Sequence, residues 1–332
     1  MTDKEQMVQA AKSAMTYVMD VNEKDAVLVV TDEARKSIGE AFAEAAKQLG
    51  CTVDFYLLPE DQRPLSEVPQ EMKQMLEGKT VVINAFTGKA EETPFRIKWI
   101  KRVLATGRIR LGHAPGITED MMLHGPMNID YPMMMNLVDR MLKALEGAKT
   151  AHITSPGGTD LHLNIEDRPF ETDVHITTEH FGNLPAGEIW CAPVETDAHG
   201  VLVCDGSIGD LGMVTSPVRM TIRNGKIESI ECEDKELLKK LNEVLYVDEE
   251  AHVIGEFGIG LNPGARITGN LLEDEKAFRT IHIAFGNNEE MAGGQNRSQT
   301  HRDFLVKDPT VTITYKDGRQ ETLIRDGEIQ VS

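Results

Sequence analysis

The sequence predicts a mixed α/β chain, in which a doubly wound parallel-sheet domain is followed by a β-rich α+β domain. Apolar runs of strand length alternate with amphipathic helical segments as far as residue 148. Beyond that point, short strands separated by Gly, Asn and Asp turns predominate. A chain of 332 residues is long enough for two domains of ordinary size. We therefore expect an α/β (flavodoxin-like) domain at 1–148 and a β-rich domain at 149–332.

The first half begins with a predicted helix at 5–19, where apolar residues recur at helical spacing and Asn22 ends the pattern. Strands and helices then alternate, which is typical of a parallel sheet covered on both faces. The turns after the first strands contain neither G-x-G-x-x-G nor a Walker sequence, so a nucleotide site is not predicted. The predicted strands are 26–32, 52–58, 80–86 and 108–113, and the further helices are 36–50, 67–78, 93–107 and 131–148.

The second half reads as β-structure with one clear helix at 234–244. No Pro/Ser/Gly-rich linker marks the boundary, which rests on the change of pattern alone. The predicted strands lie within 151–169, 188–195, 200–209, 217–234, 253–263, 281–285, 300–306 and 311–331.

Composition excludes several classes of partner. With 54 acidic and 35 basic residues the net charge is −19, which disfavours nucleic acid and anionic membrane. The four cysteines form no CxxC pair, so we expect reduced thiols. We find no run of 18 apolar residues and no signal-peptide pattern at the start, so a cytoplasmic location without membrane contact is expected.

The stretch from 282 to 303 contains the strongest chemical signal. Ile281, Ile283 and Phe285 alternate with His282, so on a strand His282 faces away from the apolar side. His301 and Asp303 are two residues apart and project together if this segment is extended. The intervening loop is rich in Gly and Asn, which permit tight turns. Imidazole with carboxylate suits zinc, cobalt, manganese or iron better than calcium or magnesium.

Two further carboxylates lie in strand-like surroundings. Glu256 stands among Gly255, Gly258 and Gly260, which let another backbone or a ligand approach closely. Glu188 lies next to apolar residues, where a charge is costly to bury unless it is paired or bound to metal. A salt bridge or an exposed edge is the alternative explanation for each.

These stretches together resemble the aminopeptidase T and S family of thermophilic-type leucyl aminopeptidases. The matching motifs are PAGEIWCAP, GEFGIGLNPGA, DEKAFRTIHIAFG and GGQNRSQTHRDF, in the family's order, with GGTDLHLNI before them. The resemblance implies a catalytic second domain that binds two divalent ions (Zn, Co or Mn). It also implies a metal-activated water that removes N-terminal residues from peptides. The implied metal ligands are Glu188, Glu256, His282, His301 and Asp303.

The chain departs from the family pattern at Glu289, where the family has a tyrosine that contacts the metal or the transition state. Because Glu289 stands at the position of this tyrosine, it is the candidate catalytic residue. An ionised carboxylate, however, cannot supply the contact that a phenol makes. The same superfamily is similar to 2,5-dihydroxypyridine dioxygenases, which hold one Fe(II). His301, Asp303 and either His252 or His282 could supply such a site. A non-catalytic metal- or ligand-binding protein is the remaining alternative.

Methionine-rich sequence at 121–143, including MM at 121–122 and MMM at 133–135, predicts soft apolar surface beyond what a short helix buries alone. We therefore expect a homodimer, with this region or the β domain at the contact. The expected partner is a short peptide or a small-molecule substrate.

Overall fold

The computed structural model describes residues 1–331 and confirms the predicted fold class. The chain forms two compact units, one from residues 1–135 and 173–186, the other from 136–172 and from 187 onward. The division falls inside helix α6 (Tyr131–Ala144), and the segment 173–186 returns to the first unit. A compact unit need not fold independently, so the domain boundary near residue 148 stays a prediction.

The first unit is built on a five-stranded parallel sheet in the order β2-β1-β3-β4-β8. Four of its strands were predicted within one or two residues. Three of them, β1, β3 and β4, are almost continuously buried, whereas the edge strand β2 is largely exposed. The fifth, β8, is a two-residue strand from the returning segment. The bounds are β1 (Ala26–Thr31), β2 (Thr52–Leu57), β3 (Val81–Ala85), β4 (Arg110–His113) and β8 (Gly182–Asn183).

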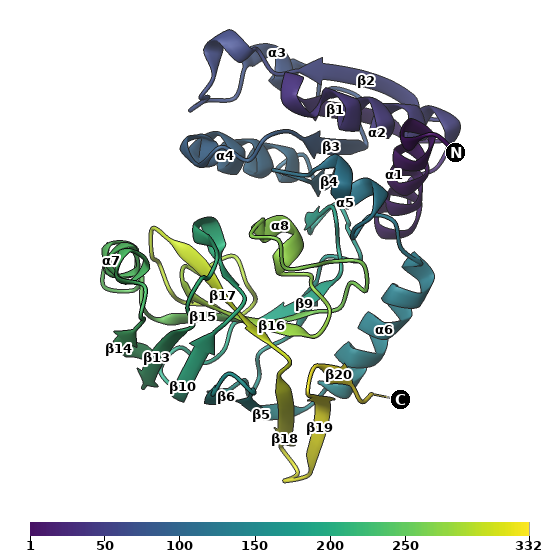
Figure 1. Cartoon of the computed structure of the whole chain (residues 1–332). Helices are drawn as coiled ribbons and strands as arrows, with labels where there is room; N and C mark the ends of the chain where they lie inside the picture. Colours follow the sequence, from purple (N-terminus) through teal and green to yellow (C-terminus); the bar gives the residue numbers. More distant parts are fainter. Residues whose placement is uncertain (332) are drawn as a thin grey trace. The chain divides into compact units, whose positions relative to one another are not determined.

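Helices cover both faces of this sheet (Figure 1). The first helix starts at a capping box, in which Thr2 and Glu5 satisfy each other's backbone N–H groups. The third helix is shorter than the predicted 67–78, because the chain beyond Gln74 forms turns. The bounds are α1 (Asp3–Met19), α2 (Lys36–Gln48), α3 (Gln70–Gln74), α4 (Thr93–Leu104) and α5 (Glu119–Leu123), with 3₁₀ turns η1 (Glu33–Arg35), η2 (Glu60–Gln62) and η3 (Ala90–Glu92).

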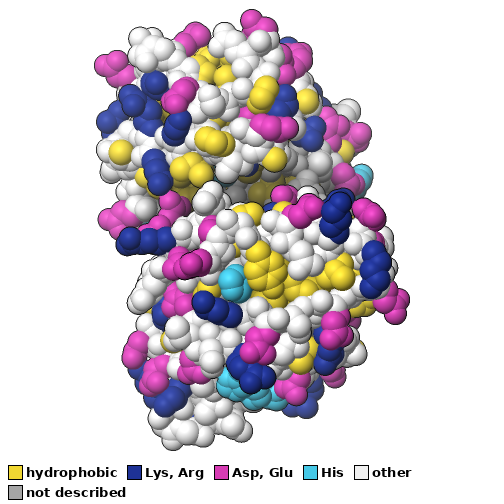
Figure 2. Space-filling view, turned by 90° about the vertical axis from the view of Figure 1, so that its left-hand side faces the viewer, with side chains coloured by type: hydrophobic (Ala, Val, Ile, Leu, Met, Phe, Trp, Pro, Cys, Tyr) yellow, Lys and Arg dark blue, Asp and Glu magenta, His cyan; other side chains and the backbone are white. Residues whose placement is uncertain are grey.

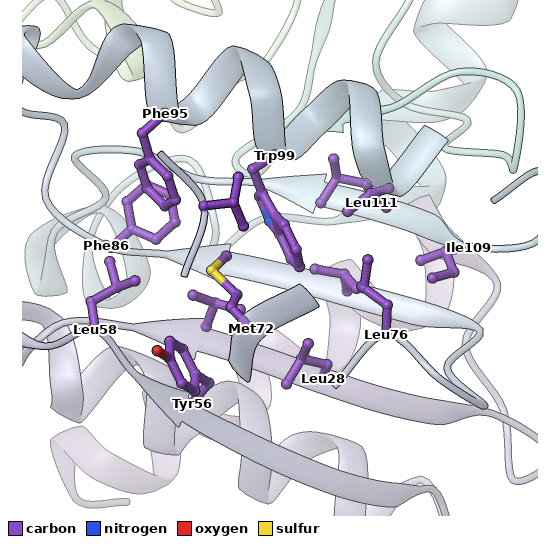
Figure 3. Close-up of a cluster of buried hydrophobic side chains, with 14 of the residues drawn as sticks. Leu28, Tyr56, Leu58, Met72, Leu76, Phe86, Phe95, Trp99, Ile109 and Leu111 are labelled. Carbon is purple, nitrogen blue, oxygen red and sulfur yellow. The ribbon is translucent and has the colours of Figure 1, made fainter. Parts of the chain in front are cut away.

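A cluster of apolar side chains fills the space between the sheet and helices α3 and α4 (Figure 3). Phe95 and Trp99 point from α4 toward the strands and are fully buried. The Trp99 indole N–H donates to Asn84 Oδ1 at 2.9 Å, and the Asn84 amide donates to His113 Nδ1 at 3.0 Å. Burial lowers the pKa of His113 to about 3, so its imidazole is neutral.

An ion triad closes the carboxyl ends of β1 and β3, where open α/β sheets usually bind ligands. Asp32 follows β1, and the guanidinium of Arg63 contacts it while also donating to both Glu92 oxygens at 2.9 and 2.6 Å. All three side chains are buried. Charged side chains of the protein itself therefore occupy this edge of the sheet, in agreement with the absence of a nucleotide-binding motif from the sequence.

The second unit contains two antiparallel sheets. One has eight strands in the order β14-β13-β10-β6-β5-β18-β19-β20 and the other seven in the order β12-β11-β17-β16-β15-β9-β7. The predicted helix appears as α7 (Lys235–Val244), and two short helices, α8 (Leu271–Asp274) and η4 (Gly209–Leu211), were not predicted.

The strands of the larger sheet are β14 (Lys226–Glu231), β13 (Val218–Arg223), β10 (Ala198–Cys204), β6 (Asp160–Asn164), β5 (Ala148–Thr154), β18 (Thr310–Tyr315), β19 (Gln320–Arg325) and β20 (Glu328–Ile329). Those of the smaller sheet are β12 (Gly212–Met213), β11 (Ser207–Ile208), β17 (His301–Lys307), β16 (Thr280–Gly286), β15 (Ile254–Gly260), β9 (Glu188–Cys191) and β7 (Glu171–Thr172). Strands β15 and β16 are buried along their whole length, so charged side chains on them need partners.

The remaining sequence expectations concern cysteine, methionine and membrane. All four cysteines are free thiols and buried. Most of the methionines that suggested a contact surface are in the core, including Met121, Met122 and Met134, whereas Met133 is 61% exposed. Within residues 1–331, no helix combines the length and the apolar character that crossing a bilayer requires.

Candidate metal centre

Four neighbouring strands of the seven-stranded sheet, β9, β15, β16 and β17, carry the five predicted ligands on one face. Glu256 pairs with Ala284, which pairs with Asp303, so these three side chains project from the same side. His282 and His301 each lie two residues from a member of this row and share its face. Glu188 pairs with Gly260, four residues from Glu256, and therefore also lies on that side.

An unbroken series of short contacts connects these five side chains, which we name the strand-face cluster. The Nε2 atom of His282 lies 3.5 Å from Glu188 Oε2 and 3.2 Å from Glu256 Oε1. The Nε2 atom of His301 lies 3.0 Å from Glu256 Oε2 and 3.5 Å from Asp303 Oδ1. The two oxygens of Glu256 thus face two different imidazoles.

Glycine at position 258 makes room for His282. These residues are paired across β15 and β16, and a Cβ atom on Gly258 would lie 1.9 Å from the Nε2 atom of His282. The imidazole therefore occupies the space that any larger residue would fill. Ala284, which pairs with Glu256 and lies two residues from His282, is a further small residue on this face. Of the glycines around Glu256, Gly258 thus permits close approach by a side chain, whereas Gly255 and Gly260 are approached by backbone carbonyl groups.

The loop after β16 fixes the orientation of His301. The Nδ1–H group of His301 donates to the carbonyl oxygen of Asn287 at 2.7 Å, which leaves Nε2 for the cluster. The Asn288 amide donates to Gly255 O at 3.0 Å. The Asn296 amide donates to Ile254 O at 2.9 Å and to Gly286 O at 3.1 Å. The loop is therefore bound to β15 and β16 by buried amide groups.

Lys276 is a member of the site that the sequence reading missed. Its ammonium group is fully buried and donates to Glu188 Oε1 at 2.7 Å, and it also contacts the carboxylate of Glu275. The signal was present as the run of four charged residues at 273–276, three residues before a buried strand. A lysine there neutralises part of the negative charge of the cluster.

Mutual pairing shifts the pKa values of the cluster. Burial raises the pKa of Glu256, but hydrogen bonds from His282 and His301 outweigh burial and hold it well below its usual range. Burial lowers the pKa of His282, whereas the hydrogen bond to Glu256 and the charges of Glu256 and Glu188 raise it to about 9. The pKa of His301 is raised through Asp303 and Glu256 in the same way. Imidazolium–carboxylate pairs therefore hold the metal-free cluster together, and binding a cation must release protons.

Two other predicted residues lie apart from this group. The Glu289 carboxylate is 45% exposed and pairs with Arg297 at 2.9 Å. The ring of His252 packs against Tyr246 with centroids 5.0 Å apart. Among the contacts found for residues 1–331, none joins Glu289 or His252 to the strand-face cluster. The catalytic role of Glu289 stays a prediction.

The donors of the strand-face cluster fit a divalent cation. One ligand atom each from Glu256, His301 and Asp303 lies within 4.8 Å of the others. Imidazole nitrogen with carboxylate oxygen is the donor set of zinc, cobalt, manganese and non-haem iron sites. The group therefore has the chemistry of a metal site in a β-rich domain.

Comparison with known proteins gives the family. Residues 133–329 match the thermophilic metalloprotease family M29, and this chain belongs to that family. Membership implies a metal cofactor, and the resemblance inferred from the motifs is confirmed.

Two curated relatives are aminopeptidases. Aminopeptidase AmpS of Bacillus subtilis (strain 168) is 24% identical over 267 residues, which cover 73% of this chain and 61% of that protein. Aminopeptidase PepS of Streptococcus thermophilus is 25% identical over 202 residues, which cover 53% of this chain and 48% of that protein. The chain thus spans about half to three-fifths of the length of these relatives.

Two solved structures share the fold over nearly the whole chain. AmpT from Thermus thermophilus superposes with a TM-score of 0.72 at 18% identity and covers 99% of this chain and 100% of its own. A 2,5-dihydroxypyridine dioxygenase from Pseudomonas putida KT2440 gives a TM-score of 0.75 at 19% identity, with 99% and 98% covered. AmpT and a dioxygenase thus share the fold of this chain, so the fold by itself does not decide the activity.

Proposed function

We propose that this protein is a metal-dependent aminopeptidase that releases N-terminal residues from short peptides. The supporting observation is the continuous series of contacts from Glu188 through His282, Glu256 and His301 to Asp303. Family membership and the two aminopeptidase relatives point to the same activity.

The arrangement favours two divalent ions, with Zn, Co or Mn as the candidates. Glu188 and His282 form one end of the strand-face cluster, and His301 and Asp303 form the other. Glu256 lies between the ends with one oxygen toward each histidine, which suits a shared carboxylate. Bound divalent ions would polarise a peptide carbonyl and lower the pKa of a water molecule toward 7. In this assignment Asn287 keeps His301 in its ligating orientation, and Gly258 leaves the space for His282.

A dioxygenase with one Fe(II) is the second candidate. Its support is the fold shared with the 2,5-dihydroxypyridine dioxygenase and the contact between Lys276 and Glu188. The ammonium occupies one Glu188 oxygen, which leaves Glu256, His301 and Asp303 as the compact donor group. Consumption of O₂ with a dihydroxylated pyridine would then replace peptide hydrolysis.

Metal counting and two assays separate the candidates. Protein stripped with chelator is dialysed against Zn²⁺, Co²⁺ or Mn²⁺, or anaerobically against Fe²⁺. The ions per chain are counted in a His162→Ala variant, so that ions held by exposed histidines of the eight-stranded sheet are not included. Two ions per chain with release of leucine from leucyl peptides supports the aminopeptidase. One iron with O₂ uptake and no peptide hydrolysis supports the dioxygenase. No bound ion after either treatment contradicts both enzymes and leaves a binding role.

Matched variants link the activity to the cluster. Asp303→Asn keeps the size of the side chain but removes a charged ligand, so we expect at least a 100-fold loss of peptidase kcat. Glu228→Gln, on the exposed strand β14 and paired with Arg223, is the control and should keep activity within about twofold. Glu289→Tyr tests the predicted catalytic position. An increase in peptidase turnover would show that this position acts in catalysis.

Assembly and location are part of the same proposal. We retain the homodimer, with the exposed Met133 on α6 as its remaining structural support, and a cytoplasmic location. A sedimentation mass near the 36.8 kDa of one chain at micromolar concentration would contradict the dimer.

A further inference from the structure

Three histidines form a row across the eight-stranded sheet, which is separate from the sheet that carries the strand-face cluster. His162 on β6 pairs directly with His152 on β5 and with His199 on β10. Directly paired residues on adjacent strands project from the same face. The rings of His152 and His162 are stacked with centroids 4.1 Å apart, and those of His162 and His199 are 5.2 Å apart. We name these residues, with Asp160, the histidine ladder.

Asp160 adds a carboxylate to this row. It lies two residues before His162 on β6 and so shares its face. Its Oδ1 atom is 2.8 Å from His152 Nε2 and 3.9 Å from His162 Nε2. One ligand atom from each of His152, Asp160 and His162 lies within 4.8 Å of the others.

The core of the sheet fixes the position of the ladder. Ala151 and Ile153 flank His152, and Leu161 and Leu163 flank His162, and all four are buried. A shift of one residue in the register would expose these apolar side chains and bury the imidazoles, so the pairing is strongly specified. The ladder is therefore held by rigid strands, while its own side chains remain open to solvent at 42% for His152 and 46% for His162. Figure 2 shows a group of histidine side chains at the surface (cyan, near the bottom of the view).

We propose that the histidine ladder is a second metal site, which binds one divalent transition-metal ion through His152, Asp160 and His162, with His199 as a further nitrogen donor. Imidazole nitrogens with one carboxylate select Zn²⁺, Ni²⁺ or Cu²⁺ and discriminate against Mg²⁺ and Ca²⁺, which prefer oxygen. The bound ion would connect three adjacent strands. This proposal does not rest on the proposed peptidase activity, because no member of the ladder belongs to the strand-face cluster.

The affinity test compares wild type with His162→Ala, since both proteins keep the strand-face cluster intact. Untagged wild type should be retained on a Ni²⁺-charged resin, and in equilibrium dialysis it should bind one Zn²⁺ ion per chain more than the variant. The dissociation constant of this ion should be at least about tenfold larger in His162→Ala. His124→Ala removes an exposed histidine outside the ladder and should behave as wild type.

Two further measurements keep the test decisive. Circular dichroism of metal-free samples checks the fold, and His162→Gln replaces the alanine variant if that variant unfolds. Cu²⁺ bound to wild type should give an electron paramagnetic resonance spectrum with nitrogen couplings that His162→Ala reduces. Equal Zn²⁺ binding by wild type and His162→Ala, loss of the ion in His124→Ala, or equal binding of Mg²⁺ and Zn²⁺ would each overturn the proposal.

Discussion

The ammonium group of Lys276 donates to Glu188 Oε1 at 2.7 Å while both side chains are almost completely buried. A cation supplied by the chain thus occupies an oxygen that a metal ion would use. Lys276 and a metal ion at this end of the strand-face cluster therefore compete for Glu188. This competition bears directly on how many ions the protein holds.

Lys276→Met should favour metal binding at the Glu188 end and weaken the metal-free fold. Removing one partner of a buried pair leaves an uncompensated charge, which costs about 3–5 kcal/mol in the free energy of unfolding. Urea unfolding with chelator present measures this loss, and Zn²⁺ should restore more stability to the variant than to wild type. Lys316→Met removes a half-exposed partner of Asp167 and should cost less than about 1 kcal/mol. A metal-free Lys276→Met protein as stable as wild type would contradict the competition.

Gly258→Ala should expel His282 from its position. The added Cβ would lie 1.9 Å from His282 Nε2, so the buried ring would have to shift. We expect an overpacking cost of about 1–3 kcal/mol and at least a tenfold loss of metal affinity. Gly88→Ala is the control, since its Cβ would meet nothing closer than 3.4 Å. Metal affinity equal to wild type in Gly258→Ala would show that His282 is not needed as a ligand.

Acid should destabilise the first unit through His113. Its folded pKa of about 3 is depressed by burial below the usual value near 6.5. Between pH 3 and pH 6.5, this histidine therefore binds a proton in the unfolded chain but not in the folded chain. This contribution to stability is complete above pH 6.5 and is lost as the pH falls toward 3, at about 1.4 kcal/mol per pH unit.

Trp99 allows this acid effect to be measured locally, because its indole lies in the same hydrogen-bonded group through Asn84. In a Trp190→Phe background, its fluorescence would follow unfolding at pH 4 to 7. His113→Gln should remove the slope of one proton, and His124→Gln should leave it unchanged. An unaltered slope in His113→Gln would assign the acid sensitivity to other groups.

Arg63→Met should strongly destabilise the first unit. The guanidinium is the shared partner of Asp32 and Glu92, and all three side chains are buried. Two unpaired buried carboxylates then remain, so a loss of about 3–5 kcal/mol is expected. Lys98→Met, which breaks an exposed pair with Glu67, should cost less than about 1 kcal/mol. Denaturant unfolding of the two variants makes the comparison, and equal losses would contradict the expected effect of burial.

Local pattern predicted the strand phases well and the long-range pairings poorly. The alternation around His282 and the spacing of His301 and Asp303 predicted their common face, because a strand has a period of two. Neither the approach of Lys276 to Glu188 nor the row of His152, His162 and His199 could be derived. The first depends on how the turn before β16 packs against β9, and the second on the register that pairs β6 with β5 and with β10. The strand β8 was missed because two residues carry no periodicity.

Among the five side chains of the strand-face cluster, His301 is the most exposed, and the other four are almost completely buried. His301 is 31% exposed, whereas Glu188 is 7% exposed and His282 1%. Solvent thus reaches the cluster on the His301 side. The His282 side is connected to that side through Glu256, which contacts both imidazoles. Ions would therefore exchange in sequence, with the outer ion leaving fast and the inner one slowly. A chelator should strip a fully loaded protein in two kinetic phases, and a partly loaded protein should hold an inner ion that small chelators reach last.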